Sequence, residues 1–108
     1  MARYMVQFSF SAEAVSGMVK NPQDRAAAVR QMIESWGGKL EAYYFTFGEY
    51  DGMAVAEVPD NVTMAAASMV ITSSGAFSAF RTTVLITTDE AVQAMKKAGT
   101  FSYTPPGS

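Results

Sequence analysis

Two carboxylates and a phenol stand next to one another at Glu49, Tyr50 and Asp51. Side chains of this kind can act as general acid and base, or offer oxygen ligands to a hard cation. With no third ligand nearby in the sequence, we expect no metal site. The same residues also suit a tight turn, in which Asp51 bonds its own backbone and Tyr50 packs over the strand ends. Glu49, Tyr50 and Asp51, together with Arg81, are therefore candidates for catalysis, with a turn as the alternative.

Arg81 interrupts a run of β-branched residues that favours a strand. If its side chain shares a face with apolar neighbours, its charge needs a partner. Glu57 or Glu41 on a neighbouring strand would supply one and fix the strand register. Alternatively, Arg81 would bind the carboxylate of a ligand.

Arg25 and Arg30 lie about a turn and a half apart on a predicted helix. They are candidates for binding an anionic ligand. The alternative is a solvated helix face, because Asp24 and Glu34 are available as surface partners.

Aromatic residues supply candidates for a mainly apolar binding cavity. Eight Met residues favour adaptable packing around such a cavity. The alternative is that the aromatic residues fill a core. The candidate ligand-binding residues are Tyr4, Trp36, Tyr43, Tyr44, Tyr50 and Arg81.

Composition excludes several classes of function. The 108 residues contain no Cys and no His, which excludes thiol nucleophiles, Cys/His metal centres and His-based acid–base catalysis. We expect no cofactor. The net charge is −2 with no basic run, so we expect no nucleic-acid partner. No apolar run is long enough for a membrane span, so we expect no membrane partner and a cytoplasmic protein.

Periodicity and capping residues predict the order of the elements. A short helix follows Ser11, and Asn21 and Pro22 begin a longer one that ends at Gly37. Asp60 or Asn61 caps the next helix, whose stripe we expect to be Val62, Ala65, Ala66, Met69 and Val70. A capping box begins the last helix at Thr87. The predicted strands cover residues 2–10, 39–48, 51–58 and 77–86.

This order predicts an α+β fold of the ferredoxin-like βαββαβ type, with an antiparallel four-stranded sheet and an additional C-terminal helix. Residues 1–100 form the predicted domain, and residues 101–108 form an extended, proline-containing tail.

Both faces of the predicted sheet carry apolar residues. Strict alternation in residues 39–48 places Tyr43, Phe45 and Phe47 on one face and Leu40, Ala42 and Tyr44 on the other. In residues 77–86 it places Phe77, Ala79 and Leu85 opposite Phe80, Val84 and Ile86. Helices cover only one face of such a sheet, and the other would be an apolar patch larger than a monomer usually exposes. We therefore expect a homodimer, or a higher homo-oligomer, that pairs sheet to sheet.

The hairpin that contains Gly48, Tyr50 and Asp51 resembles the GYD-domain family, with Glu49 inserted between the first two residues. Asp24-Arg25, the segment 37–41 and the terminal segment 103–107 are similar to that family in order and spacing. The resemblance covers essentially the whole chain and implies a dimeric α/β-barrel. The superfamily of such barrels includes cofactor-free monooxygenases, lactone isomerases, haem enzymes and ligand-sensing domains, and the GYD family itself has no established activity.

The predicted function is a small-molecule-binding or accessory domain with a mainly apolar cavity. One alternative is a cofactor-independent enzyme, monooxygenase-like or isomerase-like, acting on a small aromatic or lactone substrate. A further alternative is a structural assembly module.

Overall fold

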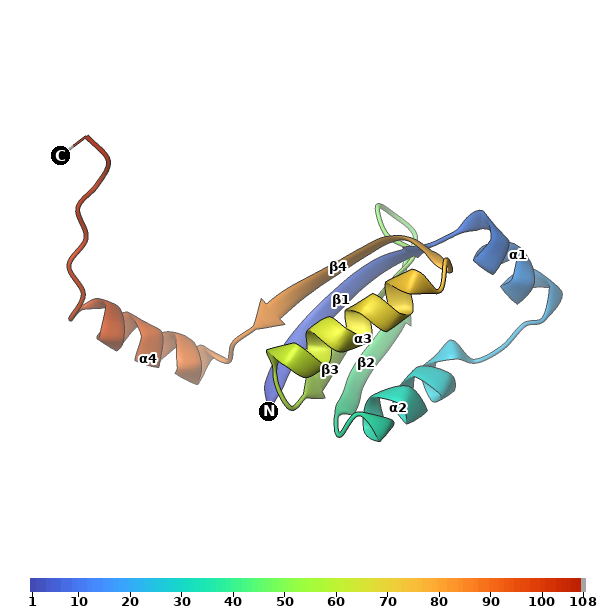
Figure 1. The fold of residues 1–108 in the computed structure, drawn as a ribbon, viewed down its shortest axis with the longest axis horizontal. Coiled ribbons are helices and arrows are strands. Elements are labelled where there is room, and N and C mark those ends of the chain that lie inside the picture. The colour runs from blue at the N-terminus through green and yellow to red at the C-terminus, as the bar shows by residue number, and fades with distance from the viewer. Residues whose placement is uncertain (108) are drawn as a thin grey trace.

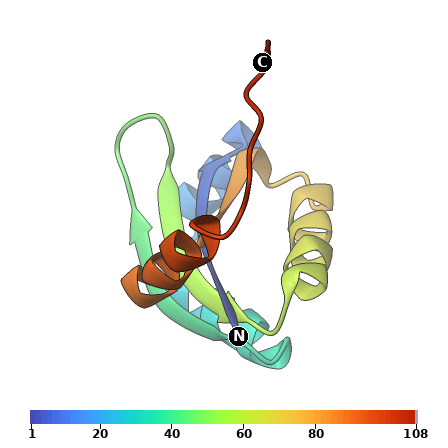
Figure 2. The same cartoon turned by 90° about the vertical axis from the view of Figure 1, so that its left-hand side faces the viewer.

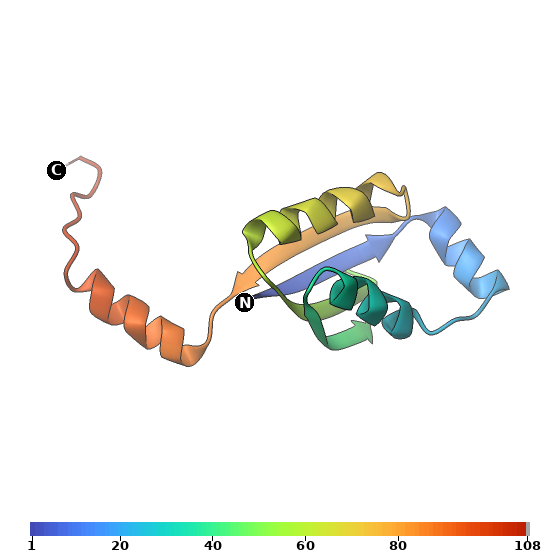
Figure 3. The ribbon, with the colours of Figure 1, turned by 60° about the horizontal axis from the view of Figure 1, so that its bottom comes forward.

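The computed structural model describes residues 1–107 and forms one four-stranded antiparallel sheet with the strand order β2-β3-β1-β4. The last residue of the predicted tail, Ser108, lies outside the described residues. Helices cover one face of the sheet, as Figures 1 and 3 show. This is the predicted ferredoxin-like arrangement. The elements are β1 (Ala2–Phe10), α1 (Ala12–Lys20), α2 (Arg25–Ser35), β2 (Lys39–Phe45), β3 (Gly52–Val58), α3 (Asn61–Ser73), β4 (Phe77–Leu85) and α4 (Thr88–Ala98).

Capping side chains begin each helix. Ser11 caps α1, Asp60 caps α3, and Thr87 and Glu90 form the predicted capping box of α4. The start of α2 differs from the prediction. Asp24, and not Asn21, is its N-cap, and its carboxylate accepts from the amide of Ala26. Asn21 instead ends α1, where its amide bonds the carbonyl of Gly17.

The core lies between the sheet and the helices. On β1 the inward side chains are those with period two, Tyr4, Val6, Phe8 and Phe10, and three of these four are buried. They pack with the inward side chains of β3 and with α2 and α3. The predicted alternation of β1 is confirmed.

Two irregularities change which side chains share a face. The register of β2 shifts between Leu40 and Ala42, so Leu40 joins Tyr43 on the helix side. The pairing of β4 shifts at its start, so Phe77 faces the helices and stacks on Phe10. The predicted division of β2 and β4 into faces is wrong at these positions, because one extra residue reverses the alternation. Phe47 lies beyond the end of β2, in the loop, and is fully exposed.

The predicted apolar stripe of α3 is also wrong. Met64 and Ala67 are the buried residues of this helix, whereas Val62, Met69 and Val70 are 65–79% exposed. Apolar side chains occur on every side of α3, so its periodicity is ambiguous, and packing on β3 and β4 selects the buried face.

The C-terminal helix and tail project away from the sheet. Leu85, at the end of β4, pairs with Arg3 near the N-terminus. From this end of the sheet α4 continues outward (Figures 1 and 2). Val92, Met95 and Phe101 are exposed along this arm. Among residues 1–107, no helix combines the length and the apolarity that crossing a bilayer requires.

Candidate functional site

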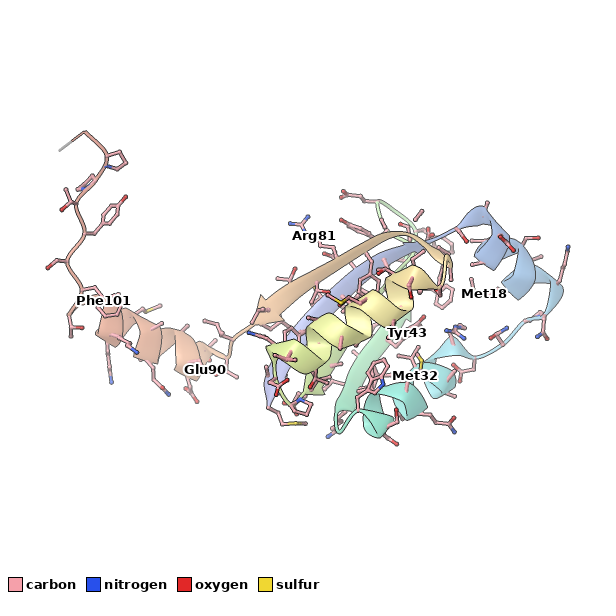
Figure 4. All side chains as sticks on the ribbon, viewed as in Figure 1. Met18, Met32, Tyr43, Arg81, Glu90 and Phe101 are labelled. Atoms are coloured by element: carbon pink, nitrogen blue, oxygen red, sulfur yellow. The ribbon has the colours of Figure 1, made fainter. Side chains whose placement is uncertain are left out.

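A cavity of about 470 Å³ lies between the inner face of the sheet and helices α1, α2 and α3. Its floor comes from β1 and β3, and its walls come from the three helices and from residues of β2 and β4. Figure 4 shows Met18, Met32 and Tyr43, three of the lining residues, around the space between α1, α2 and α3. The volume lies within the range typical of small-molecule sites.

Small side chains on β3 leave room for the cavity. The inward positions of this strand are Gly52, Ala54, Ala56 and Val58. Ala54 and Ala56 lie on the floor and fill little of the space below the helices. The two long helices also pack over different strands, α2 on β2 and α3 on β3 and β4, so they do not close over the middle of the sheet.

Aromatic rings form a rigid wall at one end. Phe10 and Phe77 stack with ring centres 5.2 Å apart, and Phe8 meets Phe77 edge to face at 5.6 Å. Phe80 meets Phe77 edge to face at 5.7 Å. Edge-to-face and offset contacts of this kind are the arrangements that aromatic pairs prefer, so the rings support one another in this wall.

Few polar groups reach the cavity. Tyr4 is buried, and its hydroxyl donates a hydrogen bond to the side-chain oxygen of Asn61. The hydroxyl proton is therefore already used in a hydrogen bond within the fold. Tyr43 is half-buried, and burial raises the pKa of its phenol, although the nearby Arg25 acts in the opposite direction. Its hydroxyl therefore stays protonated near neutral pH and can donate a hydrogen bond.

The structure brings three of the six predicted ligand-binding residues together. Tyr4, Trp36 and Tyr43 line the cavity. Tyr44 points to the opposite face of the sheet, where it is 65% exposed. Tyr50 lies in the β2–β3 hairpin, and Arg81 lies on β4 opposite Gln7, on the outer face; neither lines the cavity.

The candidates for catalysis in the hairpin also lie outside the cavity. Asp51 connects the hairpin to β1: its carboxylate accepts from the amide of Phe10 at 2.9 Å, and its own amide donates to the carbonyl of Phe8 at 2.8 Å. Thr46 closes the loop by donating its hydroxyl to the Tyr50 carbonyl. These bonds give Asp51 a structural role different from the expected bond to its own turn. A role in proton transfer for Glu49, Tyr50, Asp51 and Arg81 stays a prediction.

Arg3 takes the acidic partners that were considered for Arg81. Its guanidinium lies 2.9 Å from Glu41 and 2.7 Å from Glu57. The hydrogen bond from Arg3 lowers the pKa of the Glu41 carboxyl. Because β4 borders only β1, Arg81 is separated from β2 and β3, and its pairing with either carboxylate is contradicted.

Arg25 is a lining residue of the cavity that was absent from the six predicted ligand-binding residues but was considered with Arg30 for an anionic ligand. It opens α2, is half-buried, and lines the cavity, whereas Arg30 on the same helix is exposed. The sequence offered Arg25 and Arg30 together as candidates for binding an anion, and only the packing separates the two. No group of three or more His, Cys, Asp or Glu side chains within residues 1–107 could hold a metal ion.

The model of the GYD domain matches residues 4–95, from β1 into α4. The chain belongs to the GYD domain family. The hairpin with Gly48, Tyr50 and Asp51, which carried the resemblance to this family, is the segment that Asp51 connects to β1. No specific activity comes with the GYD match. A comparison with curated proteins gives no match.

Solved structures similar to this GYD domain share its fold at low identity. The crystal structure of MtbAldR matches with a TM-score of 0.57 and 16% identity, over 80% of this chain and 53% of that one. This chain therefore spans about half the length of MtbAldR. FFRP-DM1 matches at 0.51 and 14%, over 80% and 100% of the two chains. A hypothetical protein, PHS023 from Pyrococcus horikoshii, matches at 0.52 and 14%, over 81% and 92%. At these identities the likeness extends to the fold alone.

Proposed function

We propose that this GYD domain binds a small, mainly apolar molecule between its sheet and its helices. The observation that carries the proposal is the cavity of about 470 Å³ with its apolar lining. Moving an apolar ligand from water into such a space is favourable by about 25 cal/mol for each Å² that is buried. The aromatic end wall supports the proposal, because a preformed site loses little conformational entropy on binding.

The test fills the cavity from two directions. Ala54→Leu adds bulk from the floor and Val29→Phe adds bulk from the α2 wall, while Ala65→Leu, on the exposed side of α3, is the matched control. We expect the neutral dye Nile red to bind the wild type and the control, and to bind both cavity variants at least tenfold more weakly. Circular dichroism checks that all variants are folded. Equal binding by all four proteins, or none by the wild type, contradicts the proposal.

We further propose that the domain acts as a homodimer paired through the outer face of the sheet. Within residues 1–107 no helix covers this face (Figure 3), which carries Met5, Met53, Val55 and Leu85 among polar residues. The exposed apolar residues of the α4 arm support the same proposal, because a second chain would cover them. A cytoplasmic location stays a prediction.

Native mass spectrometry of the full chain tests the assembly. We expect a dimer for the wild type, and a monomer for Val55→Lys, which places a charge in the middle of the outer face. Gln31→Lys, on the exposed side of α2, is the control and keeps the dimer. A monomeric wild type at micromolar concentration contradicts the proposal.

A further inference from the structure

One charged side chain reaches the apolar cavity. Arg25 is the only lining residue with a formal charge among residues 1–107, and its neighbours on the wall include Met18, Met32 and Val29. It is half-buried, whereas the adjacent lining residue Gln23 is exposed, so this side of the cavity faces solvent. A ligand that filled the cavity would displace water from this guanidinium, which is costly unless the ligand itself brings an anion.

The described part of the chain supplies no such anion. The ion pairs within residues 1–107 join Arg3 to Glu41 and Glu57, on the opposite face of the sheet. The carboxylate nearest to Arg25 in sequence, that of Asp24, accepts from the Ala26 amide and caps α2. An external anion is therefore the natural partner of Arg25.

A second donor lies beside Arg25. The phenol of Tyr43 also lines the cavity and is close enough to Arg25 for the guanidinium to act on its pKa. Burial keeps the phenol protonated at neutral pH. A guanidinium and a phenolic hydroxyl that act together can satisfy the two oxygens of one carboxylate.

We propose that the ligand of this cavity is a small carboxylic acid with an apolar body, whose carboxylate binds the Arg25 guanidinium and the Tyr43 hydroxyl while the apolar body lies against Met18, Met32 and the aromatic wall. This inference rests on the proposed function and adds the chemical class of the ligand. A single cation within an apolar lining does not match a polyphosphate, whose several charges would be left without partners. A wholly neutral ligand would leave the guanidinium without a partner.

The experiment compares two probes of nearly the same shape, naphthalene-2-carboxylate and its neutral amide, by isothermal titration calorimetry at pH 7. We expect the wild type to bind the carboxylate about ten- to a hundredfold more tightly than the amide, the range for a charge-assisted hydrogen-bonded pair. Arg25→Met should abolish this preference while amide binding persists. Arg30→Met, on the exposed part of α2, should keep it.

Two more variants keep the test decisive. Arg25→Gln replaces Arg25→Met if the methionine variant does not fold, as judged by circular dichroism. Tyr43→Phe should reduce the preference about threefold to tenfold, since it removes one neutral donor. Equal affinity for the two probes in the wild type, or a preference that survives loss of Arg25, overturns this inference and leaves apolar binding intact. Failure of the wild type to bind carboxylate, amide and Nile red overturns the proposed function as well.

Discussion

Asp51 is expected to stabilise the fold through its bond to the β1 backbone. Its carboxylate accepts from the Phe10 amide at 2.9 Å, and Phe10 is a buried residue of the core. In Asp51→Ala the amide loses this acceptor at a half-buried position. A hydrogen bond to a charged group contributes about 1.5–3 kcal/mol, so we expect the free energy of unfolding to fall by about that amount.

Urea unfolding at one fixed protein concentration measures this loss, with circular dichroism and the fluorescence of Trp36 as probes. With a slope of about 1–3 kcal/mol per molar urea, the midpoint should fall by about 1 M. Asp51→Asn keeps an oxygen acceptor without the charge, so its loss should be smaller. Glu49→Ala, on an exposed neighbour, is the control and should remain within about 0.5 kcal/mol of the wild type.

An unfolding free energy for Asp51→Ala within about 0.5 kcal/mol of the wild type would refute this reasoning. The hairpin carboxylate would then be free for chemistry, and the interpretation of Asp51 as a proton-transfer residue would gain weight. A large loss for Glu49→Ala would also refute it, because the effect would then belong to the charge of the loop and not to one bond.

Three further predictions concern other contacts. Gly52→Ala should destabilise the fold by about 1–3 kcal/mol in urea unfolding, because the new Cβ would lie 2.6 Å from a core phenyl ring. If the variant were as stable as the wild type, the ring would have to move aside at little cost. Nuclear magnetic resonance titration should give Glu41 a pKa below its ordinary value of 4.5, and Arg3→Met should return the pKa to that value. The lowered pKa stabilises the fold fully at a pH above the pKa of Glu41 in the unfolded chain. This stabilisation is lost as the pH falls through the pKa of Glu41 in the folded protein. Tyr4→Phe should cost about 0.5–1.5 kcal/mol in thermal unfolding, because the fold loses the hydrogen bond from the buried Tyr4 hydroxyl to the exposed Asn61, and an unchanged melting temperature would contradict that bond.

Local patterns in the sequence determined the order and type of the elements. Period-two apolar residues predicted β1, and capping residues predicted the starts of α1, α3 and α4, because each signal depends on residues within one turn or one strand. The short link between β2 and β3 predicted their antiparallel pairing. The family resemblance, carried by the hairpin residues, is confirmed by the match over residues 4–95.

Only the tertiary structure decided how the sheet faces are composed. The register shifts that move Leu40 and Phe77 to the helix side depend on pairing with other strands, which alternation along one strand does not reveal. The buried side of α3 likewise follows from contact with β3 and β4, because its sequence is apolar all round. The sequence therefore predicted a more apolar outer face than the structure has. Arg3 and its two carboxylate partners occupy part of this face.

The sequence indicated some of the residues of the candidate site but not the cavity. Aromatic residue types pointed to Tyr4, Trp36 and Tyr43, which the fold brings together on one cavity. The cavity itself depends on empty volume above Ala54 and Ala56, between helices that pack on different strands. Volume arises from the distances between elements and not from any one residue, and for that reason the sequence supplied side chains for a site while the tertiary structure decided where the site lies.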